Sequence, residues 1–537
     1  MKRVFSIALM IVLSTLGLRA QSTILGGEVV SPANMSHMDA AKFSQQEHTF
    51  MSARVAAMGG AYTSLGADLS SMYINPAGLG MYRSSALSLS MNYDHTRSTN
   101  STQSSAAKMG DFSFNQIGTA INLYQGTGTL VSFTMGFGYN KVADLNYRNK
   151  ASWGDGDVTI GEFFAEQMYG FNPSALSSSA DPFRNKNIYT DEWGGVLAYQ
   201  TYFIDPAMDG NNTFLGGYNV TGVPLENRVN SQLSMESYGS VGEYDFSMGF
   251  NFGNILYVGT TLGVQDIEQT IYLNYLEGYV GASGAEQMSY SLYSPRVSNY
   301  GSGINFKIGA ILRPISALRI GVAYHSPTVV SLTRDYKTEL ETSFANGDTY
   351  LGESLVNSYT YDYTSPSKLL LGASLTIANR AIISVDYDKV WYGGMDMDTD
   401  GLEEAFANDV ESDLGTADNF RVGIEVLPVD NFYVRAGYAY YGSPLNRAAE
   451  KYNDEGNAFY GTYKTHTNNF SLGVGWRFAS GSTVDLSWTL SRAHYTNSVM
   501  YYYSYIDEVD NVLVSGPTLT GLTHKSNAIG LSYTLLF

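Results

Sequence analysis

From about residue 86 to the end of the chain, apolar and polar residues alternate with a period of two. The clearest case is the last segment, 528–537, with the sequence AIGLSYTLLF. Every second residue from Ile529 to Phe537 is large and apolar, and the residues between are mostly small or polar. This period places successive side chains on opposite faces of a β-strand. The pattern therefore predicts an all-β chain whose strands have one apolar face.

The opposite face of several strands carries charges. In segment 420–426, Phe420, Val422, Ile424 and Val426 alternate with Arg421, Gly423 and Glu425. A charge that faces lipid at the midplane of a membrane costs roughly 2–4 kcal/mol. If these strands cross a membrane, the apolar face must contact lipid and the charged face must point into a lumen. Only helices and closed barrels satisfy their backbone groups in lipid, so the alternation favours a barrel.

We expect about fourteen strands, with errors of a few residues at their ends. They are placed at 86–95, 113–124, 130–148, 243–252, 255–272, 302–313, 316–342, 353–377, 380–397, 418–427, 430–444, 464–478, 481–496 and 524–537. The connections 125–129, 253–254, 313–316, 378–379, 427–429 and 479–480 are short, whereas the others are mostly long, and 149–242 is the longest. Outer-membrane barrels have short periplasmic turns and long extracellular loops. The predicted fold is an all-β, 14-stranded antiparallel transmembrane barrel over 86–537, with both chain ends periplasmic.

Composition supports this fold. The chain has 42 Tyr, 25 Phe, 55 Gly and no Cys, and its mean hydropathy is −0.13. Aromatic girdles around a polar lumen give such values, and a helical membrane protein would be more apolar. The absence of cysteine excludes disulfides, thiolate catalysis and a lipidated cysteine. The net charge of −19 excludes nucleic acid as a partner. A soluble β-sandwich or propeller is the alternative fold.

The first twenty residues have the features of a secretory signal peptide. Lys2 and Arg3 precede an apolar run, Val4–Leu18, and Ala20 offers a small residue at a cleavage point. The run is shorter than the roughly twenty residues that a membrane-spanning helix needs. We therefore expect residues 1–20 to be removed on export, with an uncleaved anchor helix as the alternative.

Residues 21–85 do not alternate, and they are rich in Ala, Gly and Ser. The segment contains Gly59, Gly60, Gly66 and Asp68 among large apolar residues, a density that argues against disorder. It predicts short helices, interrupted by glycines, that fold back into the lumen as a hatch. A flexible periplasmic tail is the alternative.

A stiff turn ends this segment at Tyr73-Ile-Asn75-Pro76-Ala77-Gly78. Pro76 fixes its own φ angle and holds Asn75 in an extended conformation. Gly78 can adopt conformations closed to other residues, and the Asn75 amide can satisfy nearby backbone groups. The sequence thus predicts a reversal of the chain between the hatch and the wall.

Segment 52–79, with Tyr73, Asn75, Pro76, Ala77 and Gly78 at its end, resembles the N-terminal hatch of the FadL/TodX family of outer-membrane transporters. The resemblance implies a monomeric barrel through which long-chain fatty acids or other hydrophobic molecules diffuse without a cofactor. It also implies that ligand leaves sideways through a gap in the wall, opened by movement of the hatch. The terminal Phe537 resembles the residue that the barrel assembly machinery recognises. Outer-membrane lipid and lipopolysaccharide would surround such a barrel.

Other chemistry has little support in the sequence. Nucleophile elbows, phosphate loops and zinc motifs are missing, so we expect no enzyme activity. Asp396, Asp398 and Asp400 match the first half of a calcium loop, but its twelfth position is Ala407 rather than Glu. The bland interpretation is an acidic loop in solvent. Two alternative functions share the predicted fold: a hemin receptor, and a PorV-like barrel that carries protein cargo in secretion.

Overall fold

A computed structural model describes residues 33–48, 51–100, 106–207, 212–226, 228–399, 401–457, 459, 461–499, 518–519 and 521–537. The predicted signal peptide, 1–20, lies outside the described residues. Within the described ranges, none of the helices has both the length and the apolar content to cross a membrane.

Nineteen strand segments build one sheet. They are β1 (Ala86–Thr99), β2 (Ala107–Gln125), β3 (Leu130–Asp144), β4 (Tyr147–Gly156), β7 (Val229–Phe252), β8 (Leu256–Tyr279), β9 (Met288–Ile315), β10 (Leu318–His325), β11 (Val329–Phe344), β12 (Thr349–Glu353), β13 (Asn357–Thr364), β14 (Lys368–Ile377), β15 (Ala381–Trp391), β16 (Asp396–Met397), β17 (Thr416–Val429), β18 (Phe432–Tyr441), β19 (Lys464–Arg477), β20 (Thr483–Tyr495) and β23 (Thr523–Leu536). Before the sheet come α2 (His37–Ser44), α3 (Ala53–Ala57), α4 (Ser71–Ile74) and the 3-10 helix η2 (Pro76–Met81). The loops carry α5 (Ile160–Gln167), α6 (Pro173–Leu176), η3 (Ser178–Ala180), η4 (Pro182–Arg184), η5 (Thr190–Glu192), α7 (Trp193–Gln200), β5 (Asp205–Pro206), β6 (Phe214–Leu215), α8 (Tyr218–Thr221), η6 (Tyr392–Gly394), α9 (Glu403–Asp413), α10 (Arg447–Asp454), β21 (Ser498–Val499) and β22 (Thr518–Leu519).

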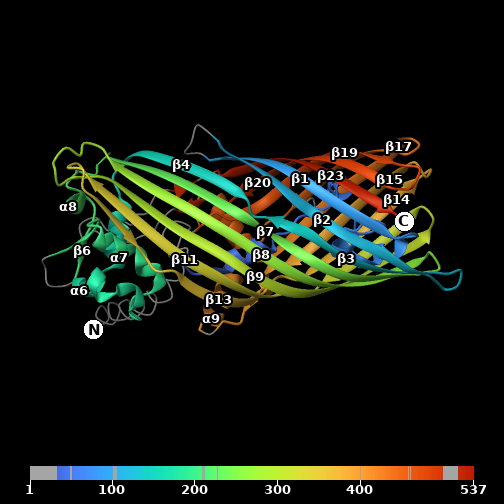
Figure 1. The fold of residues 1–537 in the computed structure, drawn as a ribbon, viewed down its shortest axis with the longest axis horizontal. Coiled ribbons are helices and arrows are strands. Elements are labelled where there is room, and N and C mark those ends of the chain that lie inside the picture. The colour runs from blue at the N-terminus through green and yellow to red at the C-terminus, as the bar shows by residue number, and fades with distance from the viewer. Residues whose placement is uncertain are drawn as a thin grey trace.

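The sheet closes into a barrel because its first and last strands pair (Figure 1). β1 runs antiparallel to β23, from Ala86 opposite Leu536 to Thr99 opposite Thr523. β3–β4, β10–β11, β12–β13–β14 and β15–β16 are each one strand with short breaks, so the nineteen segments form fourteen strands. The predicted fold class and strand number are confirmed.

The predicted strands are too short on the loop side. Predicted strand 243–252 is the 24-residue β7, and predicted strand 302–313 is the 28-residue β9. The predicted loop 149–242 is wrong at both ends, which belong to β4 and β7. Above the lipid the outward residues become polar, so the apolar alternation stops while the strands continue. The predicted unbroken strands 316–342 and 353–377 are interrupted at Pro327 and Pro366, since proline has no N–H for the ladder.

The predicted short turns all join antiparallel neighbours at one end of the barrel. Gly253 and Asn254 both have positive φ angles, 61° and 58°, and so do Ala378 and Asn379, at 49° and 52°. Two successive positive φ angles define the turn whose twist matches a two-residue hairpin. These turns therefore fix the register at the end that the sequence places in the periplasm.

The two faces of the wall have the predicted polarity. Outside, Phe420, Val422 and Ile424 of β17 are exposed, whereas Arg421 between them is fully buried in the lumen. The same outward exposure of large apolar residues recurs around the barrel. A patch of this extent would be insoluble in water, so the wall faces lipid.

The segment 33–82, which we call the hatch, runs through the lumen from the loop end to the turn end. Near the loop end, the Met35 amide donates to Tyr361 Oη at 3.3 Å. Lower down, the Ala53 amide donates to Ser532 Oγ at 2.6 Å and the Thr63 amide to Asp386 Oδ2 at 2.8 Å. Phe537 lies at the turn end, where its amide donates to Ser85 O. Residue 33 lies at the opposite end, and residues before it are outside the described ranges, so a periplasmic N-terminus stays a prediction.

A second apolar core lies at the loop end, where α5–α8 pack against the extended strands β7, β8, β9 and β11 (Figure 1). Phe164 of α5 contacts Tyr293 of β9 at 5.2 Å between ring centroids, and Trp193 of α7 lies beside Tyr336 of β11. The long strands thus carry a folded loop domain rather than the extended loop that the sequence suggested.

Glycines in the wall let the hatch approach it at backbone distance. A Cβ added to Gly259, Gly309, Gly321, Gly423 or Gly437 would lie 2.3 Å from Pro76 C, 1.9 Å from Asn75 Oδ1, 2.3 Å from Thr63 O, 2.5 Å from Met58 O and 2.1 Å from Gly59 N, respectively. Several of these glycines are cross-strand neighbours, such as Gly259 with Gly309 and Gly423 with Gly437. These five wall glycines, which we call the glycine floor, therefore form a surface without side chains against which the hatch packs.

Gly437→Ala tests this floor. The new Cβ has no space beside Gly59, so the hatch must shift, and overpacking of this kind costs about 1–3 kcal/mol. We expect faster cleavage of the hatch by protease and a lower unfolding temperature. Gly394→Ala is the matched control, because a Cβ there meets no atom within 4 Å. Equal protease resistance of the two variants would contradict a close-packed floor.

Candidate functional site

The Asn75-Pro76-Ala77-Gly78 turn lies against the inner wall at β9 and β10. Asn75 Nδ2 donates to Thr63 O at 2.7 Å, and Asn75 Oδ1 accepts from the Ala77 amide at 3.2 Å. Asn75 thereby caps η2 while Pro76 occupies its first turn. The Asn75 amide thus forms hydrogen bonds with backbone groups before and after the chain reversal, as expected for this turn.

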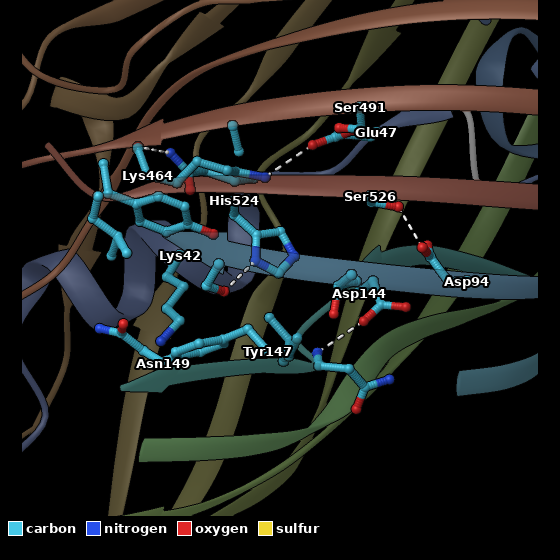
Figure 2. A pocket seen from close by; sticks show the side chains of 18 of the residues that line it. Lys42, Glu47, Asp94, Asp144, Tyr147, Asn149, Lys464, Ser491, His524 and Ser526 are labelled. Atoms are coloured by element: carbon cyan, nitrogen blue, oxygen red, sulfur yellow. Dashed lines mark hydrogen bonds and ion pairs between the residues drawn. The ribbon is translucent and has the colours of Figure 1, made fainter. Parts of the chain in front are cut away.

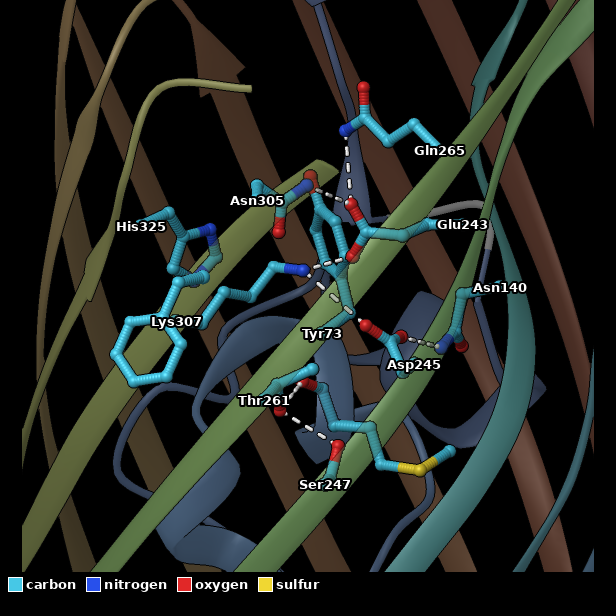
Figure 3. Close-up of polar contacts among 12 residues, drawn as sticks. Tyr73, Asn140, Glu243, Asp245, Ser247, Thr261, Gln265, Asn305, Lys307 and His325 are labelled. Carbon is cyan, nitrogen blue, oxygen red and sulfur yellow. Dashed lines mark hydrogen bonds and ion pairs between the residues drawn. The ribbon is translucent and has the colours of Figure 1, made fainter. Parts of the chain in front are cut away.

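Tyr73 lies at the centre of a buried polar network (Figure 3). The Lys307 ammonium lies 4.7 Å from the centre of the Tyr73 ring and pairs with Glu243 and with Asp245, at 3.3 Å from the latter. Asn140 Nδ2 donates to Asp245 Oδ2 at 2.7 Å. The network joins β3, β7 and β9, and Tyr73 of the hatch contacts it through Lys307 of β9.

The other hatch residues singled out in the sequence have structural roles. Gly59 and Gly60 end α3 with φ angles of 63° and 76°. Gly66 lies so close to the turn that a Cβ on it would be 2.7 Å from Gly78 O. Asp68 accepts from Ser52, the N-cap of α3, at 2.9 Å. Whether these residues take part in gating stays a proposal.

An ion-pair chain fixes α3 to the wall. Arg54 donates to Glu425 at 3.1 Å, and Arg435 also donates to Glu425, at 2.6 Å. Arg435 then reaches Asp485 at 2.7 Å. Buried charges are retained when each has a partner, and breaking such a pair costs about 3–5 kcal/mol. The part of the hatch around α3 is therefore attached to the wall by ion pairs as well as by packing.

The wall has a seam between β2 and β3–β4. The ladder joining β2 to β3 ends at the Gln116–Asn140 pair, and beyond it β4 pairs with β7. The loop-side half of β2, residues 107–115, pairs with β1, and none of the described strands pairs with its other edge. Side chains bridge the seam instead: Asn146 Nδ2 donates to Asp111 Oδ2 at 3.0 Å.

A bend in the third strand creates this seam. The predicted continuous strand 130–148 breaks at Leu145 and Asn146, opposite Gly239 of β7. Gly239 has a φ angle of 148°, and a Cβ there would lie 2.0 Å from Glu268 O, so only glycine fits beside the bend. At the start of the bend the hatch residue Glu47 donates its amide to Val142 O at 3.0 Å. Hatch and seam are thus in direct contact.

A cavity of about 110 Å³ lies between the hatch and the bend (Figure 2). Its walls include Asp94 of β1, Asp144 and Tyr147 at the bend, and His524 of β23. From the hatch, the Lys42 ammonium lies 5.1 Å from the centre of the Tyr147 ring, while Glu47 pairs with Lys464 at 2.9 Å. Most of the residues that line this cavity are polar or charged, although their apolar atoms form the larger part of its surface.

An apolar pocket lies instead at the loop end. It has a volume of about 470 Å³ and is formed by the start of α2, by α9 and by α10, with Met38, Phe406 and Phe459 among its lining residues. His37 closes one side, 3.0 Å from Asp413 and 3.7 Å from Asp409. Burial raises the pKa of the Asp409 carboxyl, and His37 opposes that shift. The size is that of small-molecule sites.

Helix α2 separates the two spaces. Residues His37 and Met38 at its start line the outer pocket, and Lys42 in its last turn lines the polar cavity. Its N-cap Ser36 and Asp39 form a capping box, and Asp39 pairs with Arg334 of β11 at 2.9 Å.

The calcium candidate is not assembled in the described residues. Asp396 and Asp398 are exposed in and after β16, and Asp400 lies outside the described residues. Ala407, where a calcium loop needs its last carboxylate, lies within α9. In the part of the chain that the structure describes, no three acidic or histidine side chains cluster as a metal site. The interpretation favoured from the sequence, an acidic loop in solvent, stays the prediction.

The resemblance implied a gap in the wall, but sequence reasoning did not locate the seam or either cavity. The bend carried a weak signal, since Asp144-Leu145-Asn146 interrupts the alternation of the third strand. The outer pocket carried no sequence signal, because its residues come from the hatch and from two loops more than 350 positions further along the chain.

Asn75→Asp separates the two roles of the amide. The carboxylate keeps the acceptor for the Ala77 amide but cannot donate to Thr63 O, which is left without this bond. An unsatisfied buried polar group costs about 1–3 kcal/mol. We expect both Asn75→Asp and Asn75→Ala to loosen the hatch and raise ion conductance in a planar bilayer. Asn527→Ala, on the exposed outer face, is the control. Wild-type conductance in Asn75→Asp would show that the donated bond is dispensable.

No protein-family model and no curated protein sequence matches this chain. Among solved structures, it is similar to a Pseudomonas aeruginosa FadL homologue, with 14% identity, a TM-score of 0.50, and coverage of 91% of this chain and 98% of that one. It is also similar to the Pseudomonas putida toluene transporter TodX, with 13% identity, a TM-score of 0.50, and coverage of 92% and 100%. The resemblance inferred from the sequence is thus confirmed in the fold: the chain has the FadL/TodX-type barrel fold.

Proposed function

We propose that the protein is a monomeric outer-membrane channel for diffusion-driven uptake of hydrophobic small molecules, with long-chain fatty acids as the first class to test. The observation that carries the proposal is the seam between β2 and β3–β4, which adjoins a cavity lined by the hatch. A closed wall would deliver ligand only to water. An interrupted wall lets an apolar molecule pass from the lumen directly into lipid.

The proposed path has three stages. A hydrophobic molecule first enters the apolar outer pocket, where each buried methylene contributes about 0.8 kcal/mol of transfer free energy. Displacement of α2 then opens the way to the inner cavity. The bend at Leu145 and Asn146 finally gives access to the seam, and the hatch residue Glu47 holds that bend through Val142 O. The hatch below remains seated and prevents leakage of polar solutes.

Two separate observations support a hydrophobic ligand: the fold of the barrel and the side chains that line the inner cavity. Two proteins of this fold are a FadL homologue and a toluene transporter by their descriptions. In this chain the inner cavity contains the Lys42 ammonium, which forms no ion pair with a described carboxylate. A fatty acid has a carboxylate that this ammonium can neutralise, whereas toluene has none. The ammonium therefore favours an amphiphile over a hydrocarbon.

Uptake by cells with and without the protein tests the proposal. We expect the protein to increase entry of labelled long-chain fatty acid without increasing entry of a polar solute of similar size. Toluene is the second apolar probe. Unchanged entry of both apolar probes, with the protein present in the outer membrane, would contradict the proposal. Co-purification of a secreted protein under those conditions would favour the cargo-carrying alternative.

Lys42→Met tests the class of ligand. Methionine keeps the length of the side chain but loses the charge, and a charge-assisted hydrogen bond is worth about 1.5–3 kcal/mol. We expect at least about a tenfold loss of apparent affinity for fatty acid and little change for toluene. Lys451→Met, on the exposed face of α10, is the control. An equal loss for both probes would assign Lys42 a structural role.

A further inference from the structure

Four cationic residues form a row on the outside of the barrel. Arg492 of β20 lies opposite Lys525 of β23, which lies opposite Arg97 of β1, which in turn lies opposite Lys108 of β2. All four side chains are exposed on the outward face. Neighbouring strands are about 4.8 Å apart, so the row places four positive charges within about 15 Å.

The positive charges of the row are not neutralised by any acidic side chain among the described residues. No described acidic side chain lies within ion-pair distance of any of the four, although the chain has 50 acidic and only 31 basic residues. Two other outward cations do have carboxylate partners: Lys337 of β11 lies 3.1 Å from Glu339, and Arg148 of β4 lies 2.8 Å from Glu236. Like charges directly opposite each other destabilise a sheet. An external polyanion would remove this repulsion.

The height of the row identifies the kind of polyanion. On β1 the outward residues from Leu87 to Tyr93 are apolar, and Arg97 follows ten residues beyond Leu87. At about 3.3 Å per residue and a tilt near 40°, this distance is about 25 Å along the membrane normal, the height of the apolar band of such barrels. On β23, Lys525 lies ten residues from Leu535. The row therefore lies at the loop-side edge of the hydrocarbon layer.

We propose that Arg97, Lys108, Arg492 and Lys525 bind the phosphate groups of a lipopolysaccharide molecule in the outer leaflet. Its phosphates lie where the acyl chains end, which is the height of the row. Arg and Lys form strong, charge-assisted hydrogen bonds with phosphate. The acyl chains of the bound lipid would cover the apolar residues below, such as Tyr93 and Ile529.

The proposed site adjoins the seam. Lys108 belongs to the half of β2 that has one edge paired with none of the described strands, and its carbonyl accepts from Arg148 Nη1 at 3.4 Å across the seam. A lipid bound at the row would therefore stand beside the point of lateral exit. The inference rests on the proposed outer-membrane location, but it is independent of which ligand passes through the lumen.

Lipid titration of the purified full-length protein tests the site. The test variant combines Arg97→Gln, Lys108→Gln, Arg492→Gln and Lys525→Gln. The matched control removes four cations elsewhere, with Arg296→Gln, Lys337→Gln, Arg380→Gln and Lys389→Gln. Native mass spectrometry of delipidated protein in detergent measures binding of lipopolysaccharide, of the same lipid after removal of its phosphates, and of inorganic phosphate as competitor. Gel mobility with and without heating shows that each variant is folded.

We expect about fivefold weaker lipopolysaccharide binding for each charge removed, hence a loss of roughly six hundredfold in the four-site variant. The control should bind as the wild type does, and the dephosphorylated lipid should bind as weakly to wild type as lipopolysaccharide does to the four-site variant. Equal losses in the two variants, or tight binding of the dephosphorylated lipid, would overturn the proposal. Displacement by equimolar inorganic phosphate would also overturn it, by showing a free-anion site. If the four-site variant fails to fold, Arg97→Gln with Lys525→Gln must still show a loss of about twentyfold, and an unchanged affinity would overturn the proposal.

Discussion

The close approach of the hatch to the glycine floor of the lumen is the constraint on which the rest of the structure depends. Gly309, Gly321 and Gly437 have no side chains, and polar atoms of the hatch therefore lie directly against the backbone of the wall at these positions. Where backbones come this near, their polar groups must find partners, and Asn75 supplies several of them. The glycine floor thus determines the position of the Asn75–Gly78 turn. The turn then determines the position of the end of the hatch, after which β1 begins.

The same constraint explains why the lumen is both charged and tightly closed. Charged residues of the wall that cannot face lipid point inward, where Lys307 and Arg435 meet carboxylates beside the hatch. These pairs and the floor hold the lower hatch firmly. The upper hatch is held differently: α2 lies between two cavities and touches the wall mainly through side chains such as Asp39. The contacts between hatch and wall therefore differ between the floor and the level where β2 and β4 separate.

The sequence was sufficient to predict what depends on local periodicity. Strand number, the short turns and the polarity of each face follow from alternation such as that around Arg421, and the boundary at the Asn75 turn follows from its special residues. The extensions of β7 and β9 above the membrane were missed because their outward residues are no longer apolar. The resemblance implied a gap in the wall, but the positions of the seam, the cavities and the row of cations depend on how distant segments pack: Arg97 and Lys525 are neighbours only after the barrel closes.

The central claim is that hydrophobic molecules leave through the seam, and closing the seam with a cross-link tests it most directly. Asp111→Cys and Asn146→Cys replace the two side chains that meet across it, in a chain that has no other cysteine. A short bifunctional methanethiosulfonate would join them through bonds that a reductant cleaves. Uptake of labelled fatty acid should fall to the level of cells without the protein on cross-linking and return on reduction. Unchanged uptake through a cross-linked seam would contradict the account.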